Sequence, residues 1–158
     1  MRNRLLIIAV LLLTTSVLQA QKTVPQYEPE ALYHQGLTFF QNGAYGAALE
    51  SFTQYLSTVG DPKLQKSVDA QYYIAVSSLY AGHADAEAKI KAFINDNPGS
   101  TWATHANFLY ANVLFAKRKY ADAVAIYGNT SPSSLTREEA QQLQFNMGYA
   151  YFQLNDFD

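Results

Sequence analysis

The sequence predicts an all-α protein built from a helical hairpin that is repeated along the chain, and two recurring patterns carry this prediction. In the first pattern an aromatic residue precedes a small residue by three positions. The aromatic residues follow one another at steps of 39, 36 and 37 residues. A fixed step of this kind is the sequence signature of repeat architectures. The pairs are Tyr33 with Gly36, Tyr72 with Ala75, Phe108 with Ala111 and Phe145 with Gly148.

The second pattern is longer and supports the first. The run Tyr45-x-x-Ala48-Leu49-x-x-Phe52 returns 75 residues later, after two repeat lengths, as Tyr120-x-x-Ala123-Val124-x-x-Tyr127. Apolar residues within each repeat recur with a period near 3.6, which is typical of amphipathic helices. The turn signals fall too far apart for short strands. We therefore expect helices throughout and no sheet.

Turn residues mark where the expected helices end. Asn42-Gly43 and Gly82 are placed to end helices in a left-handed turn, because glycine adopts positive φ without steric strain. The cluster Lys117-Arg118-Lys119 falls where the first helix of the third repeat ends, and positive charge there meets the negative end of the helix dipole. We interpret this cluster as helix-end charge rather than as a binding patch.

Capping residues mark where helices begin. Asp61, and either Ser100 or Thr101, are the expected N-caps of the helices that open the second and third repeats. Thr136 and Glu139 have the spacing of a capping box for the first helix of the fourth repeat.

The N-terminus has the three-part pattern of a secretory signal. Arg2 and Arg4 precede an unbroken apolar run from Leu5 to Leu13, and small Ala20 suits the position just before the cut. The alternative, an uncleaved membrane anchor, is disfavoured because the apolar segment is 14 residues even when extended to Leu18. A spanning helix needs about 20. We therefore expect a signal peptide at 1–20 and a disordered segment at 21–28 that leads into the first repeat.

Charge and cysteine content exclude several classes of function. Without residues 1–20 the chain has 9 basic and 13 acidic side chains, and it has no basic face for nucleic acid. The absence of cysteine excludes disulfides, thiolate metal sites and a lipidated cysteine after the signal. We expect an exported protein, most simply periplasmic and associated with the cell envelope, with no transmembrane segment in the mature chain.

These residues resemble the tetratricopeptide repeat (TPR) family, whose unit is a helix-turn-helix of about 34 residues. The resemblance covers nearly all of residues 30–158, and the second unit matches least well because His83-Ala84-Asp85-Ala86 lacks the expected aromatic residue. It implies a right-handed α-α superhelix, or solenoid, of about 3.5 repeats. The matching residues are Tyr33, Gly36, Phe39, Tyr45, Ala48 and Phe52, then Tyr72, Ala75 and Pro98, then Phe108, Ala111, Leu114, Tyr120, Ala123 and Tyr127, and finally Phe145, Gly148, Tyr151 and Phe157.

The units are expected at about 29–60, 61–98, 99–132 and 133–158, so the repeats occupy 29–158. The fourth unit has its first helix and almost none of its second. Repeat arrays normally end in a polar capping helix, so we expect this sequence to be the N-terminal part of a longer protein. The alternative is that the fourth unit buries its apolar face against a partner or by self-association.

No motif for phosphate binding, zinc hydrolysis or a serine nucleophile is present. His34, His83 and His105 are widely spaced, and Glu30 four residues before His34 is read as a solvated helix pair rather than a metal or acid–base site. We therefore expect no catalytic residue, no metal and no cofactor.

The resemblance implies instead a concave groove lined by the first helix of each repeat. Aromatic side chains there suit an extended or helical peptide, although the same positions are aromatic in the family for packing between hairpins, and that structural role stays open. Family members that bind a partner's C-terminal carboxylate use lysine, arginine and asparagine, which are not found at the comparable positions here. The expected groove residues are Tyr33, Leu37, Phe40, Tyr72, Val76, Tyr80, Phe108, Asn112, Phe115, Phe145, Tyr149 and Phe152.

The sequence thus favours a non-catalytic scaffold in the bacterial envelope that binds a protein or peptide partner of unknown identity. The alternative is a docking module of a larger enzyme whose catalytic domain follows residue 158. A downstream nucleophile or metal motif would distinguish the two.

Overall fold

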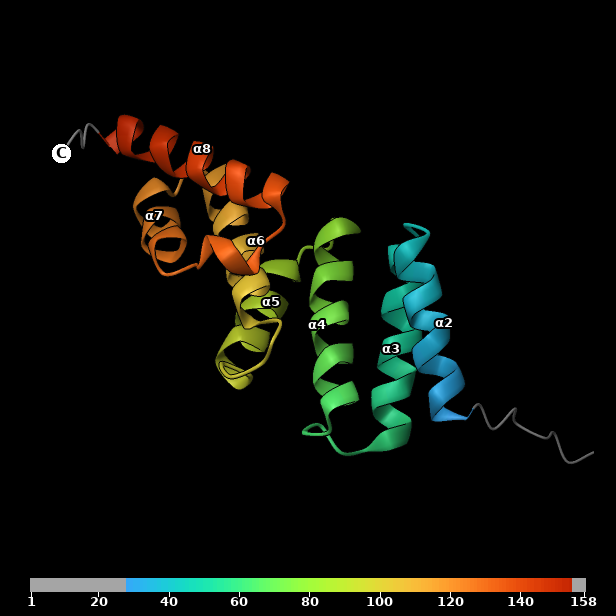
Figure 1. The fold of residues 1–158 in the computed structure, drawn as a ribbon. Coiled ribbons are helices and arrows are strands. Elements are labelled where there is room, and N and C mark those ends of the chain that lie inside the picture. The colour runs from blue at the N-terminus through green and yellow to red at the C-terminus, as the bar shows by residue number, and fades with distance from the viewer. Residues whose placement is uncertain (1–27, 155–158) are drawn as a thin grey trace, which may run out of the picture.

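The structure is a computed structural model that describes residues 28–154; the predicted signal peptide and most of the predicted disordered segment lie outside this range. The described residues form seven α-helices and one 3₁₀ turn, with no strand, which confirms the all-α class (Figure 1). The elements are α2 (Pro29–Gln41), α3 (Tyr45–Val59), α4 (Gln65–Tyr80), α5 (Ala86–Asp96), α6 (Ala103–Ala116), α7 (Tyr120–Gly128), η2 (Pro132–Ser134) and α8 (Arg137–Leu154).

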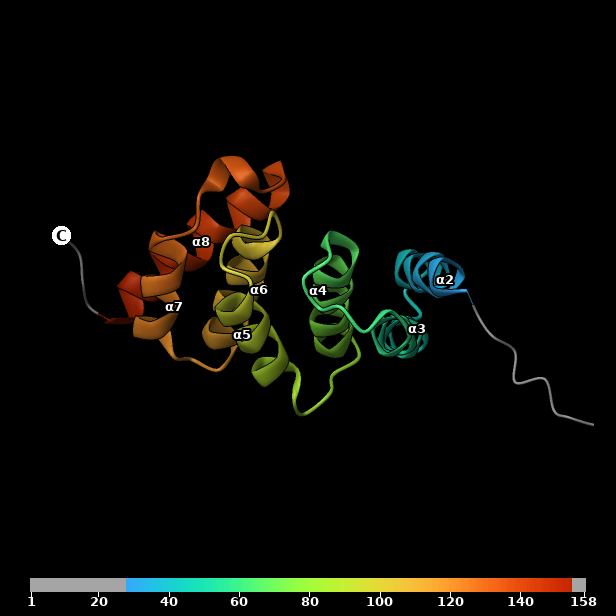
Figure 2. The same ribbon diagram turned by 90° about the horizontal axis from the view of Figure 1, so that it is seen from below.

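Each helix packs against the next helix in the chain, and short loops make neighbours antiparallel. We call α2, α4, α6 and α8 the first helices of the hairpins and α3, α5 and α7 the second helices. First helices also contact each other: α2 contacts α4, and α6 contacts α8. The result is an elongated row with α2 and α3 at one end and α7 and α8 at the other (Figures 1 and 2).

The turn inside each hairpin contains one residue with positive φ, just after the first helix. Gly43 and Gly82 take φ values of 73° and 71°, so both turns are left-handed as predicted. Arg118 occupies the corresponding place after α6 and takes φ 58° although it is not glycine. The third hairpin therefore makes the same turn with a residue for which that conformation is strained.

Close helix packing depends on small residues at the predicted repeat position. A Cβ atom added to Gly36 of α2 would lie 2.8 Å from the ring of Phe52 on α3, so only glycine fits there without a shift. Ala75 and Ala111, at the same position of α4 and α6, are buried. Buried apolar residues form two clusters, one around α2 and α3 and the other from α4 to α8. Partly buried Phe40 and Tyr73 pack against both.

Aromatic trios link successive hairpins. Phe40 at the end of α2, Tyr45 at the start of α3 and Tyr80 of α4 have ring centroids 4.9 to 6.3 Å apart. Phe115, Tyr120 and Tyr149 repeat this arrangement across α6, α7 and α8 at 5.6 to 6.1 Å. The Phe40–Tyr45 contact and all three contacts of the second trio are edge-to-face, a geometry that stabilises packing beyond the area it buries, whereas Tyr80 is tilted against its two partners.

The predicted N-caps were wrong in two cases and confirmed in one. Helix α4 begins three residues later than Asp61 implies, with Leu64 as its N-cap, because the Asp61 carboxylate accepts the Lys63 N–H in a local turn. Ser100 likewise accepts the Trp102 N–H, and Trp102 is the N-cap of α6.

The capping box at the start of α8 is confirmed. The Thr136 hydroxyl accepts the Glu139 N–H at 3.3 Å, and the Glu139 carboxylate accepts the Thr136 N–H at 2.9 Å. In the described part of the chain, no helix is both long enough and apolar enough to cross a membrane.

Candidate binding groove

A groove lies where the first helices of three successive hairpins, α4, α6 and α8, come together, and it encloses about 360 Å³. Its walls are mainly apolar, and the Tyr80 ring on its α4 side is half exposed. Two polar side chains of α8 face it from the other side. The lining residues are Leu79, Tyr80, Phe108, Leu109, Asn112, Val113, Ala116, Glu139 and Gln142.

A chain of hydrogen bonds ties the three groove helices together. His105 of α6 stands between α4 and α8: its Nδ1 lies 2.5 Å from the Tyr72 hydroxyl, and its Nε2 lies 2.7 Å from a Glu139 carboxylate oxygen. His105 and Glu139 are each about three-quarters buried. Their bonds therefore lie where solvent weakens them little, and they fix the spacing of the groove walls.

Glu139 is ionised more readily than an ordinary glutamate. Partial burial alone would raise the pKa of its carboxyl, but the Thr136 N–H and the His105 ring outweigh this, and the pKa is lowered from its usual value of 4.5. Both partners donate to the charged form and so stabilise it. The carboxylate at the mouth of the groove is thus held in place as an anion that is already paired.

Asn112 on the groove floor belongs to a second polar network. Its Oδ1 accepts hydrogen bonds from the Tyr127 hydroxyl at 2.5 Å and from Asn146 Nδ2 at 3.1 Å. This network joins α6, α7 and α8 and orients the Asn112 amide. The Asn112 NH₂ group donates no hydrogen bond to residues 28–154. The groove floor therefore presents a hydrogen-bond donor whose orientation is fixed by the bonds that the amide oxygen accepts.

The expected groove residues differ in their surroundings. Tyr33, Tyr72, Val76 and Phe108 are buried, and Phe108 also borders the groove. Tyr80 and Asn112 line the groove with it, while Leu37 and Phe40 are half-buried in the first hairpin. Phe115, Phe145 and Tyr149 line a second hollow, and Phe152 is exposed further along α8. Burial raises the pKa of the Tyr33 and Tyr72 hydroxyls well above the ordinary range, so both stay neutral.

The second hollow adjoins the groove. It encloses about 330 Å³, and Ala116 lines both this hollow and the groove. Its other lining residues are Phe115, Arg118, Tyr120, Phe145 and Tyr149.

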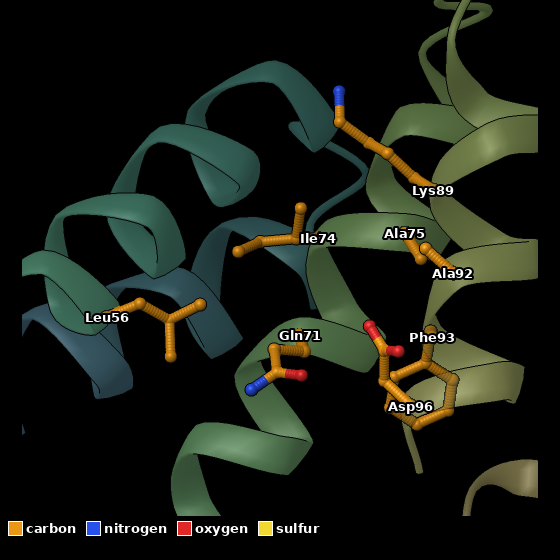
Figure 3. Close-up of a pocket in the computed structure, with 8 residues that line it drawn as sticks. All are labelled: Leu56, Gln71, Ile74, Ala75, Lys89, Ala92, Phe93 and Asp96. Atoms are coloured by element: carbon orange, nitrogen blue, oxygen red, sulfur yellow. The ribbon is translucent and has the colours of Figure 1, made fainter. Parts of the chain in front are cut away.

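A smaller pocket of about 230 Å³ lies away from the groove, between α3, α4 and α5 (Figure 3). Leu56 of α3 and Ile74 of α4 point into it, and Lys89 and Asp96 of α5 stand at its rim (Figure 3). Its mouth is wide, and the sequence patterns did not indicate it. Gln71, Ala75, Ala92 and Phe93 complete its lining.

The His34–Glu30 pair considered in the sequence lies on the surface. His34 Nε2 is 3.2 Å from Glu30 on an exposed helix face, and Lys66 also pairs with Glu30, so this is a solvated pair as predicted. Among residues 28–154, no group of three or more histidine, aspartate or glutamate side chains is arranged to hold a metal ion.

Several groove residues were missed by the sequence analysis. Leu109, Val113 and Ala116 follow one another at spacings of four and three on the same side of α6, beside Asn112, so helical periodicity could have found them. Glu139 and Gln142 belong to a polar stretch of α8, and nothing in that stretch distinguishes a groove side from a solvent side.

No protein-family model matches this chain, and no curated protein sequence is similar to it. A function is therefore inferred from the fold and from the groove.

Proposed function

We propose that this chain is a non-catalytic interaction scaffold, a TPR-like right-handed α-solenoid that binds a peptide segment of a partner protein in the groove between α4, α6 and α8. The observation that carries the proposal is the groove itself. Three successive first helices line it with mainly apolar side chains, and a half-exposed Tyr80 ring stands at one wall. Concave, mostly apolar surfaces with a few fixed polar groups are typical of binding sites.

The polar groups of the groove suit a peptide backbone. The Asn112 NH₂ group is a donor held in place from behind by Tyr127 and Asn146, so a peptide carbonyl can accept from it without a rearrangement. Gln142 offers both a donor and an acceptor on the opposite wall. Apolar contacts on Tyr80, Leu109 and Val113 then supply most of the affinity.

The signal at residues 1–20 supports export to the periplasm, and the mature chain then begins at Gln21. Mass spectrometry of the exported protein tests this part of the proposal. A mass that retains residues 1–20 contradicts it.

A displayed peptide library selected against the exported protein tests the groove. We expect the selected peptides to be rich in apolar residues and to lose affinity about tenfold for Tyr80→Ser, because this change removes the exposed ring of the groove wall. The matched control is Tyr151→Ser on α8, an exposed tyrosine outside the groove, which should leave affinity unchanged. Equal affinity for both variants and the wild type contradicts binding in the groove.

A further inference from the structure

The groove between α4, α6 and α8 has a negative charge on one wall. Within residues 28–154, Glu139 is the one charged side chain that lines the groove, and it is 25% exposed. The other lining residues are apolar or neutral. A charge beside apolar walls attracts an opposite charge more strongly than a charge surrounded by water does. The groove therefore favours a ligand that carries a positive charge.

The other acidic side chains that form ion pairs are already compensated by lysine. Glu139 differs from them, because its ion-pair partner is the His105 ring, at 2.7 Å. No lysine or arginine in the described part of the chain forms an ion pair with Glu139. The three carboxylates that pair with lysine form the pairs Glu30–Lys66, Asp85–Lys89 and Glu87–Lys117.

The surroundings of Glu139 leave this part of the groove negative. Partial burial opposes ionisation, but hydrogen bonds from Thr136 and His105 outweigh it and lower the pKa of the Glu139 carboxyl, so the group is an anion at neutral pH. Arg137 and Glu138, the two residues before it, have opposite charges. The start of α8 adds about half a positive charge, which is less than the full negative charge of the carboxylate.

The hydrogen bonds that hold Glu139 leave part of its acceptor capacity unused. A carboxylate has about four acceptor positions, two on each oxygen. Oε1 accepts one hydrogen bond from His105 at 2.7 Å, and Oε2 accepts one from the Thr136 N–H at 2.9 Å. One position on each oxygen remains. Two parallel N–H groups of a guanidinium fit this arrangement.

Tyr80 of α4 supplies an aromatic surface on the opposite wall. Phe40 and Tyr45 pack against its ring with centroids 6.3 and 4.9 Å away, yet Tyr80 stays 49% exposed. Burial is the main cause that raises the pKa of the Tyr80 hydroxyl, and Tyr45 and the Glu139 charge raise it further, so the hydroxyl is within electrostatic reach of the carboxylate. Arginine combines the two contacts, because its planar cation stacks on aromatic rings and pairs with carboxylates.

We propose that Glu139 and Tyr80 form a subsite for one arginine side chain of the partner's peptide. This inference rests on the proposed function and adds the residue that sets its specificity. The guanidinium donates two hydrogen bonds to Glu139 and stacks on Tyr80, while apolar neighbours of the arginine contact Leu109 and Val113. Lysine fits less well, because its ammonium group is a compact charge that cannot form the two parallel bonds or stack on a ring.

A displayed library of random peptides, selected in parallel against the wild type and two variants, tests the subsite. The wild type should select apolar peptides that share one arginine. Glu139→Gln keeps the shape of the side chain but not its charge, so it should select apolar peptides without enrichment of arginine. The matched control is Glu138→Gln, an exposed carboxylate in the same turn that does not line the groove, and it should select the same peptides as the wild type.

A comparison of two peptides separates the subsite from any disturbance of α8. One is a selected peptide, and the other has its arginine replaced by glutamine. This replacement should weaken binding to the wild type about tenfold, because a charge-assisted pair is lost. It should leave binding to Glu139→Gln almost unchanged. An effect of Glu139→Gln on the position of α8 acts on both peptides and cancels in the comparison.

Variants of Tyr80 test the aromatic wall in the same way. Tyr80→Phe keeps the ring and should keep the preference for the arginine peptide. Tyr80→Leu remains apolar but loses the ring, so the preference for arginine over glutamine should fall. An equal preference in both variants would overturn the role of the ring.

The possible results separate the subsite from the groove. Apolar peptides selected by the wild type without arginine overturn the subsite and leave binding in the groove intact. An equal loss of affinity with wild type and Glu139→Gln, when the arginine is replaced, does the same. Equal enrichment of lysine and arginine overturns the assignment to a guanidinium, and enrichment of acidic residues overturns the charge preference. If no peptide is selected, both the subsite and the proposed function fail.

Discussion

At the scale of single residues, Gly36 and Gly148 occupy the same repeat position in opposite surroundings. Phe52 packs directly on Gly36, whereas the position above Gly148 is open. Packing therefore explains why position 36 is glycine, but it does not explain the glycine at position 148.

Gly36→Ala and Gly148→Ala should change stability in opposite directions. The added methyl group at position 36 meets the Phe52 ring, and overpacking of this kind costs about 1–3 kcal/mol. At position 148 alanine improves an exposed helix position by about 0.5–1 kcal/mol. Urea denaturation followed by circular dichroism measures both. Two changes of the same sign would contradict the contact between α2 and α3.

Arg118→Gly should raise stability by about 0.5–1 kcal/mol. Arg118 takes the left-handed conformation that glycine takes at the ends of α2 and α4, and this conformation strains a residue with a Cβ atom. The gain is partly offset because glycine has more freedom in the unfolded chain. Thermal melts provide the measurement.

Lys119→Gly is the matched control for this change, because φ is −84° at Lys119 and glycine relieves no strain there. It should stabilise less than Arg118→Gly, because glycine at this N-cap position relieves no strain from positive φ. A gain in stability from Lys119→Gly as large as that from Arg118→Gly would contradict the explanation by strain.

At the scale of helices, the Tyr72–His105–Glu139 chain sets how α4, α6 and α8 stand around the groove. The Glu139 carboxylate has two roles, since it caps the start of α8 and accepts from His105. The pKa of this group is lowered in the folded protein, so its contribution to stability is complete above its ordinary pKa of 4.5. That contribution is lost as the pH falls through the lower folded value.

Glu139→Gln should lower stability at pH 7 by about 1 kcal/mol, because glutamine keeps the shape but loses the charge-assisted bonds. The difference between wild type and variant should shrink as the pH falls below 4.5, because the Glu139 carboxyl takes up its proton first in the unfolded chain and only at lower pH in the folded protein. Urea denaturation at a series of pH values measures this difference. A gap that stays constant from pH 7 to pH 3 would show that the charge of Glu139 has no part in holding α8.

Most of the helices and turns were predictable from the sequence because their signals are local. The 3.6-residue period, Gly43, Gly82 and the Thr136–Glu139 pair each act within a few residues. The predictions failed at Asp61 and Ser100, which cap local turns just before their helices. A capping residue a few positions upstream cannot be told from an N-cap without knowing where the helix starts.

The candidate site was less predictable because exposure depends on distant packing. Tyr33 and Phe145 share a repeat position, yet one is 7% exposed and the other 72%. What separates them is whether a second helix covers the face, and the repeat pattern predicts this difference because it gives the fourth unit almost no second helix. The groove side of α8 was missed because no residue near it records which helices pack around it.

At the scale of the whole molecule, Tyr73 connects the two halves of the fold. Its ring stacks on Phe52 of the first cluster at 5.1 Å and lies 5.7 Å from Trp102, the N-cap of α6, while Phe40 contacts it from α2. Repeat proteins are stabilised by contacts between neighbouring units, so the loss of one such contact should separate the units on either side.

Tyr73→Ala should destabilise the protein by about 2–3 kcal/mol and act mainly on the first hairpin. Hydrogen exchange should accelerate in α2 and α3 and stay close to wild type in α6 to α8. The control is Tyr110→Ala, in the other cluster. With this variant, hydrogen exchange should accelerate in α6 to α8 and stay close to wild type in α2 and α3. A uniform acceleration along the chain in both variants would mean that the molecule unfolds as one unit.

The central claim is that the groove between α4, α6 and α8 holds a partner, and site-specific photo-crosslinking tests it most directly. A photoreactive residue at Gln142 lies in the groove, and the same residue at Gln144 lies on the exposed side of the same helix outside it. In cells that export the protein, we predict a discrete adduct with a partner polypeptide from position 142 that is lost on Tyr80→Ser and absent from position 144. Equal adducts from both positions, or none from position 142, would contradict the claim.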